Sequence, residues 1–279
     1  GEVTFLNKVQ TLGASVFAEC TKIGKVIVPD SVTSIGVAVF EGCYRVTECE
    51  LSNQLEVLPE RTFSTPYSTG LTMSVTFPAS IRRIENKAFF GGHKFVDFSF
   101  PPTLEAIGAE AFSGCTVKGD LSVPASIKSI GSSTFATFRV EGTLTFEEGV
   151  SASVFSALVN YGATASETWV AHAIRIPASL TWQNPFQYGG ARDAYEVAAD
   201  SECFAAIDGV LYSKGPNNKY ESKSAVLVSC PTDMSGPFAV AEGTRSVEDG
   251  ALSKEIDSVT IPSTADALKS SAFRGHALR

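Results

Sequence analysis

The segment VIVPDSVTSIGVAVFEGC at residues 26–43 contains the features that decide the fold of this chain. Its first three residues place Val26 and Val28 on one side of an extended backbone, which is typical of a short β-strand with one buried face. Pro29 ends that strand, because proline has no N–H to give to a sheet. Further apolar residues follow, and a phenylalanine stands at position 40, eleven residues after the proline.

The same pattern returns along almost the whole chain. Apolar–polar–apolar–proline motifs recur at residues 75–78, 98–101, 121–124, 174–177 and 259–262. The phenylalanine recurs at steps of 23 residues, with one early step of 26 and a long interval before the last copy: Phe17, Phe40, Phe63, Phe89, Phe112, Phe135 and Phe273. With degenerate copies included, ten repeats begin near residues 3, 26, 49, 75, 98, 121, 144, 174, 238 and 259. A fixed period of this length predicts a repeat architecture.

One repeat buries only about six side chains and therefore cannot fold alone, whereas stacked repeats share a continuous core. We expect parallel strands about 4.8 Å apart, with like residues in columns through the interior. Two stretches leave the period: a loop near 156–173, and a segment in which Asp208-Gly209 between apolar runs predicts a β-hairpin. The predicted organisation is a solenoid of about eight coils at 1–202, a hairpin insertion at 203–237 and two further coils at 238–279.

These residues resemble the BspA-like leucine-rich repeats, whose pattern is close to V-x-I-P-x-S-V-x-x-I-G-x-x-A-F-x-x-C. Residues 26–43 depart from that pattern only at Val39, where the family prefers alanine. The resemblance implies a β-rich, right-handed leucine-rich-repeat stack with short helical turns and a β-hairpin insertion. It also implies a surface or secreted protein, of the kind found in anaerobic bacteria and some parasitic protists, that adheres to host proteins or other cells.

Composition narrows the classes of partner. The chain has 279 residues, with 22 Lys and Arg against 30 Asp and Glu, and its formal net charge of −8 argues against nucleic-acid binding. No stretch approaches the roughly 18–20 apolar residues of a membrane span, so we expect no membrane insertion of this segment. We expect the natural protein to continue beyond this chain, because residue 1 falls inside a coil and the last coil lacks a polar capping segment.

The sequence contains no motif of a catalytic, cofactor or metal site. Nucleophile-elbow, zinc-protease, P-loop and dinucleotide motifs are all missing. The three histidines, His93, His172 and His276, fall in separate predicted loops, where we expect exposed side chains. We therefore predict no enzyme activity, no cofactor and no bound metal.

Six cysteines are present, and none belongs to a C-x-x-C pair, which argues against a structural zinc site: Cys20, Cys43, Cys49, Cys115, Cys203 and Cys230. We interpret them as small buried thiols that fill layers of the core. If the protein is exported, the alternative is a disulfide between Cys20 and Cys43, or between Cys203 and Cys230, because neighbouring layers lie within bonding reach.

The strand positions that point away from the core form the candidate binding face. In leucine-rich solenoids such a ladder is the usual recognition surface. The candidate residues are small, hydroxylic or acidic: Glu48, Glu50, Ser74, Thr76, Asp97, Ser99, Asp120 and Ser122. The alternative is that they are merely solvated outward positions, as on any half-buried sheet. The face lacks the aromatic platforms that sugar binding usually requires.

We therefore expect a monomeric, non-enzymatic interaction or adhesion module, extracellular or at the cell surface, whose ligand is a protein of the host extracellular matrix or of a cell surface. The first alternative is a structural spacer within a larger surface protein, with no ligand of its own. The second is a hydrolase built around His172 or His276.

Overall fold

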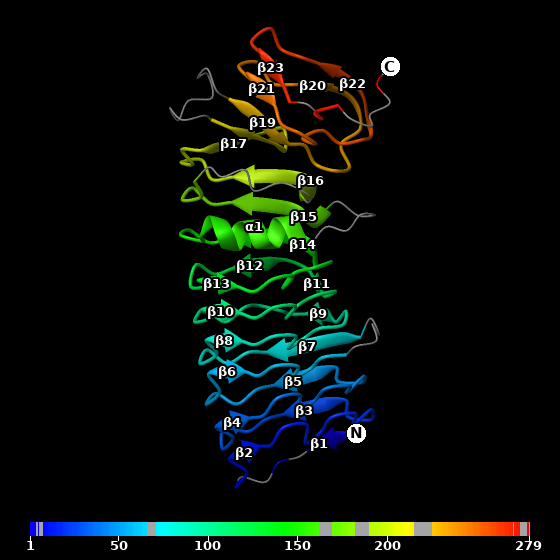
Figure 1. The fold of residues 1–279 in the computed structure, drawn as a ribbon, viewed down its shortest axis with the longest axis vertical. Coiled ribbons are helices and arrows are strands. Elements are labelled where there is room, and N and C mark those ends of the chain that lie inside the picture. Colours follow the sequence, from blue (N-terminus) through cyan, green and yellow to red (C-terminus); the bar gives the residue numbers. More distant parts are fainter. Residues whose placement is uncertain are drawn as a thin grey trace. The chain divides into compact units, whose positions relative to one another are not determined.

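The computed structural model describes residues 1–3, 5, 8–65, 71–161, 169–181, 190–214, 225–269, 271–273 and 278 (Figure 1). The chain divides into two compact units, Gly1–Gly142 and Thr143–Arg279. Both units are built mainly from parallel strands that are paired between successive turns of the chain. The protein is thus a parallel β-solenoid with very little helix, as the repeat predicts.

The main sheet of the first unit follows a path of one strand from each turn, and all neighbours on this path are parallel. Its strands are β1 (Glu2–Val3), β3 (Lys25–Ile27), β5 (Glu48–Glu50), β7 (Thr72–Thr76), β9 (Lys94–Val96), β11 (Thr116–Lys118) and the start of β14 (Arg139–Phe146). The register places Val26 opposite Cys49, and Cys49 opposite Val75. These three side chains are buried, so the alternation in each strand gives one face to the core.

Two further parallel sheets of two-residue strands run along the opposite part of the turns, and we call them together the second sheet. The pair β2 (Thr11–Leu12) and β4 (Ser34–Ile35) is parallel, and so are the four strands β6 (Val57–Leu58), β8 (Arg83–Ile84), β10 (Ala106–Ile107) and β13 (Ser129–Ile130). Glycine follows several of these strands because the turns approach closely there. A side-chain carbon on Gly108 would lie 2.4 Å from the backbone nitrogen of Asn86 in the preceding turn.

The predicted phenylalanine column is present and continuous through the first unit. Adjacent rings from Phe17 to Phe135 stack with centroids 5.3–5.9 Å apart and interplanar angles of 5–14°. Phe40, Phe89 and Phe112 are fully buried, whereas Phe17, in the first turn, is half-buried. The rings lie nearly parallel because each is held by the same backbone in its own turn.

The predicted strand position is wrong in the fifth repeat. We expected a strand at residues 98–100, but β9 lies four residues earlier, and its residues pair with β7 and β11. The reason is that Phe95, Phe98 and Phe100 are all buried, so alternation fits two positions in this turn. The sixth repeat has both strands, β11 and the predicted β12 (Leu121–Val123), which pairs with β14.

The second unit continues the repeat and adds the irregular elements. It contains α1 (Ala152–Tyr161), the parallel pair β15 (Trp169–Ile176) and β16 (Gly190–Val197), and a second parallel pair, β20 (Gly236–Ala239) and β22 (Ile256–Thr260). A five-stranded sheet runs in the order β17 (Phe204–Ile207), β18 (Val210–Ser213), β19 (Val226–Ser229), β21 (Ser246–Val247) and β23 (Ala267–Leu268).

The predicted hairpin is confirmed. Strands β17 and β18 are antiparallel, and Ile207 pairs with Val210 across the turn. Asp208 and Gly209 have φ values of 50° and 76°, as a tight two-residue hairpin turn requires. Val210 and Tyr212 from the hairpin are buried in the same core as Val247 and Ile256, so the insertion is packed into the second unit.

The stacked core predicts a large penalty for removing a central ring. We expect Phe112→Ala to lower the free energy of unfolding by about 3–5 kcal/mol, because it leaves a cavity between two stacked neighbours. Phe17→Ala, which removes a half-buried ring from the first turn, is the matched control and should cost less. Denaturant unfolding checks both, and a loss below about 1 kcal/mol for Phe112→Ala contradicts a packed ladder.

Candidate functional site

The eight candidate residues all reach solvent. Glu48 and Glu50 flank the buried Cys49 on β5, and Ser74 and Thr76 have the equivalent positions on β7. Ser122 is the exposed central residue of β12. These five side chains lie on strands of the main sheet, as predicted.

The other three candidates lie beside the strands. Asp97 directly follows β9 and has a positive φ of 53°, and Ser99 lies two residues further on. Asp120 directly precedes β12. A carboxylate oxygen of Asp120 would lie 2.4 Å from a side-chain carbon added to Gly142, so Asp120 packs across the next turn.

Lysine residues on the same face change its electrostatics, and sequence reasoning missed this effect. The Nζ atom of Lys25 donates to Oε1 of Glu48 at 2.6 Å, and this hydrogen bond raises the pKa of Lys25. Lys118 forms the same kind of bond to Glu141 at 2.5 Å. In both pairs the two residues are 23 positions apart, which is one repeat. A lysine and a glutamate at this spacing were therefore the sequence signal that could have predicted these ion pairs.

Glu50 and Asp97 differ from Glu48. Both are exposed, and neither forms an ion pair within 4.0 Å among the residues that the structure describes. Thr76 lies beside Glu50 in the adjacent strand, in register with it. Among the eight candidate residues, Glu50 and Asp97 are therefore the carboxylates chosen as the centre of the face, and hydroxyl side chains lie near them in the sheet.

A second charged cluster lies on β15 and β16 of the second unit. Nδ1 of His172 and Oδ2 of Asp193 are 2.7 Å apart, and Arg175 pairs with Glu196 at 2.7 Å. The paired strands shift register between residues 169 and 173, and such bulges often re-aim side chains. A histidine–carboxylate pair orients an imidazole, but nucleophilic catalysis also needs a hydroxyl or thiol at the other ring nitrogen. His172 and Asp193 supply the histidine–carboxylate part of such an arrangement.

The expectation that the histidines are exposed is wrong for His93 and lies outside the described residues for His276. His93 is 2% exposed, and its Nε2–H donates to the carbonyl oxygen of Phe63 at 2.8 Å. Burial lowers the pKa of His93 to about 4. Cys43 and Cys115 have corresponding places in their turns, where each thiol donates to a phenylalanine carbonyl of a preceding turn at 3.1 Å.

All six cysteines are free thiols in the structure. Burial raises the pKa of Cys43 to about 11 and the pKa values of Cys115 and Cys230 to about 12, and it raises the pKa of Cys49 as well. Cys20 and Cys203 are only half-buried. Within the described part of the chain, no three His, Cys, Asp or Glu side chains are placed to hold a metal ion.

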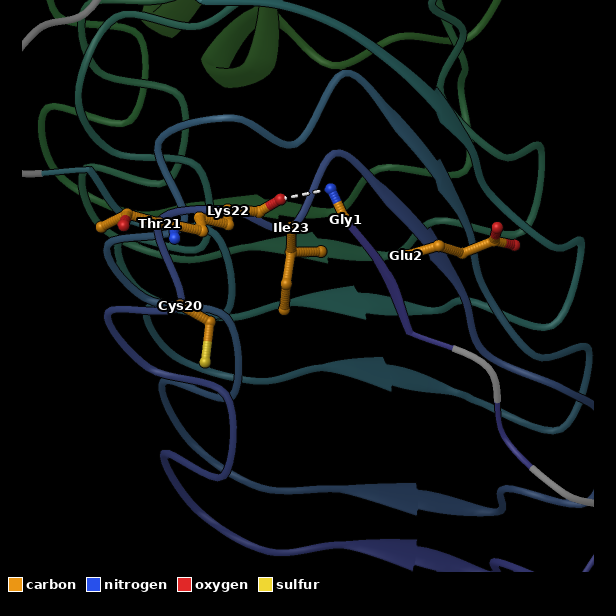
Figure 2. Close-up of a pocket in the computed structure, with 6 residues that line it drawn as sticks. All are labelled: Gly1, Glu2, Cys20, Thr21, Lys22 and Ile23. Carbon is orange, nitrogen blue, oxygen red and sulfur yellow. Dashed lines mark hydrogen bonds between the residues drawn. The ribbon is translucent and has the colours of Figure 1, made fainter.

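The described residues line several concave features of the surface. A pocket of about 340 Å³ lies in the first turn (Figure 2) and is lined by Gly1, Glu2, Cys20, Thr21, Lys22 and Ile23. Two grooves of about 380 and 400 Å³ follow the second sheet at β8–β13 and β4–β6. None of the helices in the described residues has the length and apolarity needed to cross a membrane.

Proline-terminated parallel strands, a 23-residue period and a stacked phenylalanine column together define a leucine-rich-repeat solenoid. The sequence matches the family described as BspA type leucine rich repeat region in six copies, over residues 1–70 and 65–160. The chain belongs to this family. No curated protein matches it significantly.

Two solved structures illustrate the likeness. The pneumococcal vaccine antigen PcpA is 20% identical, with a TM-score of 0.54 over 90% of this chain and 58% of that chain. A leucine-rich cell surface protein from Faecalibacterium prausnitzii is 20% identical, with a TM-score of 0.49 over 97% of this chain and 64% of that chain. This chain thus spans less than two thirds of either protein, and the likeness to PcpA concerns the fold.

Burial predicts a division among the thiols. The thiolate is the reactive form, so buried cysteines with raised pKa values should react slowly. We expect Cys20 and Cys203 to react with an aromatic disulfide reagent in the native protein, and the other four only after denaturation. Thiol titration with and without denaturant measures this, and fewer than six thiols in denaturant would reveal a disulfide.

Proposed function

We propose that this chain is the interaction module of a cell-surface or secreted protein and that it binds a protein ligand without catalysis. The outward face of the main sheet, centred on Glu50 and Asp97, is the proposed binding site. The observation that carries the proposal is that these two exposed carboxylates lack an ion-pair partner in the described structure, whereas Glu48 on the same face is bound to Lys25.

Rigidity supports this assignment. Glu50 and Thr76 project from strands that are paired on both sides, and Asp97 directly follows such a strand, so little conformational entropy is lost when a ligand binds. The hydroxyl groups of Ser74, Thr76, Ser99 and Ser122 donate and accept hydrogen bonds, which suits a polar protein surface. Membership of the BspA-type family and the likeness to the vaccine antigen PcpA favour an extracellular location.

The ligand class follows from charge. Exposed carboxylates such as those of Glu50 and Asp97 favour partners with basic side chains, and steering of this kind acts mainly on the association rate. Extracellular matrix and cell-surface proteins with basic segments are therefore the proposed ligands. We propose that the module acts as a monomer, because the face is complete within one chain.

A panel of matrix and cell-surface proteins tests the proposal. The test variant removes charge without changing shape: Glu48→Gln, Glu50→Gln, Asp97→Asn and Asp120→Asn. Asparagine is chosen at position 97 because it tolerates the positive φ found there. The matched control removes four carboxylates from the turns that flank the second sheet: Glu56→Gln, Glu60→Gln, Glu105→Gln and Glu110→Gln.

We expect the test variant to bind its ligand at least about tenfold more weakly, equivalent to about 1.4 kcal/mol, whereas the control keeps its affinity. Equal binding by both variants and the unchanged protein rules out the acidic face as the site. Absence of any ligand in the panel favours the spacer role, in which the stack only separates other domains.

A further inference from the structure

His93 is buried, and the groups that surround it are uncharged. The rings of Phe89 and Phe95 lie 6.2 and 6.0 Å from its imidazole, and Oγ1 of Thr65 is 3.4 Å from Nε2. Cys115, in the next turn, is the titratable neighbour, and its thiol stays protonated because burial raises its pKa to about 12. No charged side chain contributes to the pKa of His93, so no carboxylate offsets the cost of burying an imidazolium.

The surroundings of His93 supply a hydrogen-bond acceptor for only one of its two ring nitrogens. Nε2–H donates to the Phe63 carbonyl, and Nδ1 has no hydrogen-bond partner among the described residues. Protonation would therefore add a second N–H that finds no acceptor inside the core, together with a full charge. Both effects favour a conformation in which the ring reaches water.

His93 occupies a sensitive position in the main sheet. It directly precedes β9, and its carbonyl accepts the N–H of Thr116, the first residue of β11, at 2.8 Å. The N–H of Lys94 donates to Leu71, next to β7, at 2.8 Å. If the ring leaves the core, the backbone between these two hydrogen bonds must move with it. The pairing of β9 with β7 and β11 therefore depends on the protonation state of His93.

We propose that His93 makes β9 an acid-sensitive joint in the first unit, at which protonation opens the stack between the turns of Phe63 and Cys115. The closed state binds the proton weakly, with a pKa of about 4, and the open state binds it with the ordinary value of 6.5. The closed state is therefore favoured above pH 6.5 and loses this preference as the pH falls towards 4. At the corresponding positions of other turns, the thiols of Cys43 and Cys115 donate the same hydrogen bond, and a thiol has no basic nitrogen that could be protonated.

Hydrogen exchange of the β9 amides tests the joint in the whole chain. The test variant is His93→Cys, which installs the donor found at Cys43 and Cys115, and His172→Gln is the control histidine. Comparing exchange rates of two proteins at one pH cancels the intrinsic chemistry. We compare the amide exchange rate of residues 94–96 in the unchanged protein with the rate in His93→Cys. The ratio of these two rates should rise roughly 50-fold from about pH 7 to about pH 4.5, and His172→Gln should exchange like the unchanged protein.

A second measurement needs no variant. With only three histidines, the imidazole carbons are resolvable by nuclear magnetic resonance, and one ring should stay neutral until about pH 4. If His93→Cys does not fold, His93→Phe replaces it, since Phe138 has the corresponding place two turns later. Titration of all three rings near pH 6.5, or an exchange ratio that does not change with pH, overturns the proposal.

Discussion

The N–H of each ladder phenylalanine donates to a carbonyl one turn further along the chain, at 2.7–3.0 Å from Phe17 to Phe112. Because these bonds leave each turn and end in the next, every turn must repeat the backbone path of its neighbour. Side chains at equivalent positions are then forced into columns about one strand spacing apart. The aromatic column, the glycines after the second sheet and the cross-turn ion pairs all follow from this one requirement.

The sequence was sufficient for the columns but not for every strand. The period of 23 residues predicted stacked rings from Phe17 to Phe135, and side-chain alternation predicted β3, β5 and β7. In the fifth repeat the same alternation fits both the segment of Phe95 and that of Phe98, and local pattern cannot choose between them. Pairing with β7 and β11 determines which segment becomes the strand, and the residues that make this pairing lie in the neighbouring turns.

The positive φ values in the turns could not be predicted from the conformational preferences of the residues. A column of residues other than glycine adopts φ values of 54–57°: Ser15, Ala38, Arg61, Lys87, Glu110 and Ser133. Such residues rarely take this conformation, and the sequence signals for it are glycine, asparagine and aspartate. Here the cross-turn hydrogen bonds, for example from Ala38 to Glu60 and from Lys87 to Ala109, hold the backbone in place. Tertiary structure therefore overrides local preference at this position in successive turns of the first unit.

The same logic limits what a sequence says about the binding face. Alternation identifies which residues point outward, but the charge that a ligand meets depends on the residue one turn away. Glu48 is bound to Lys25 in the preceding strand, whereas Glu50, two residues later, stands beside Thr76 and keeps its charge exposed. His93 is the opposite case: its sequence context predicted an exposed loop residue, but its ring is buried by residues from other turns. In a stacked repeat, the properties of a side chain therefore depend on the order of residues down its column.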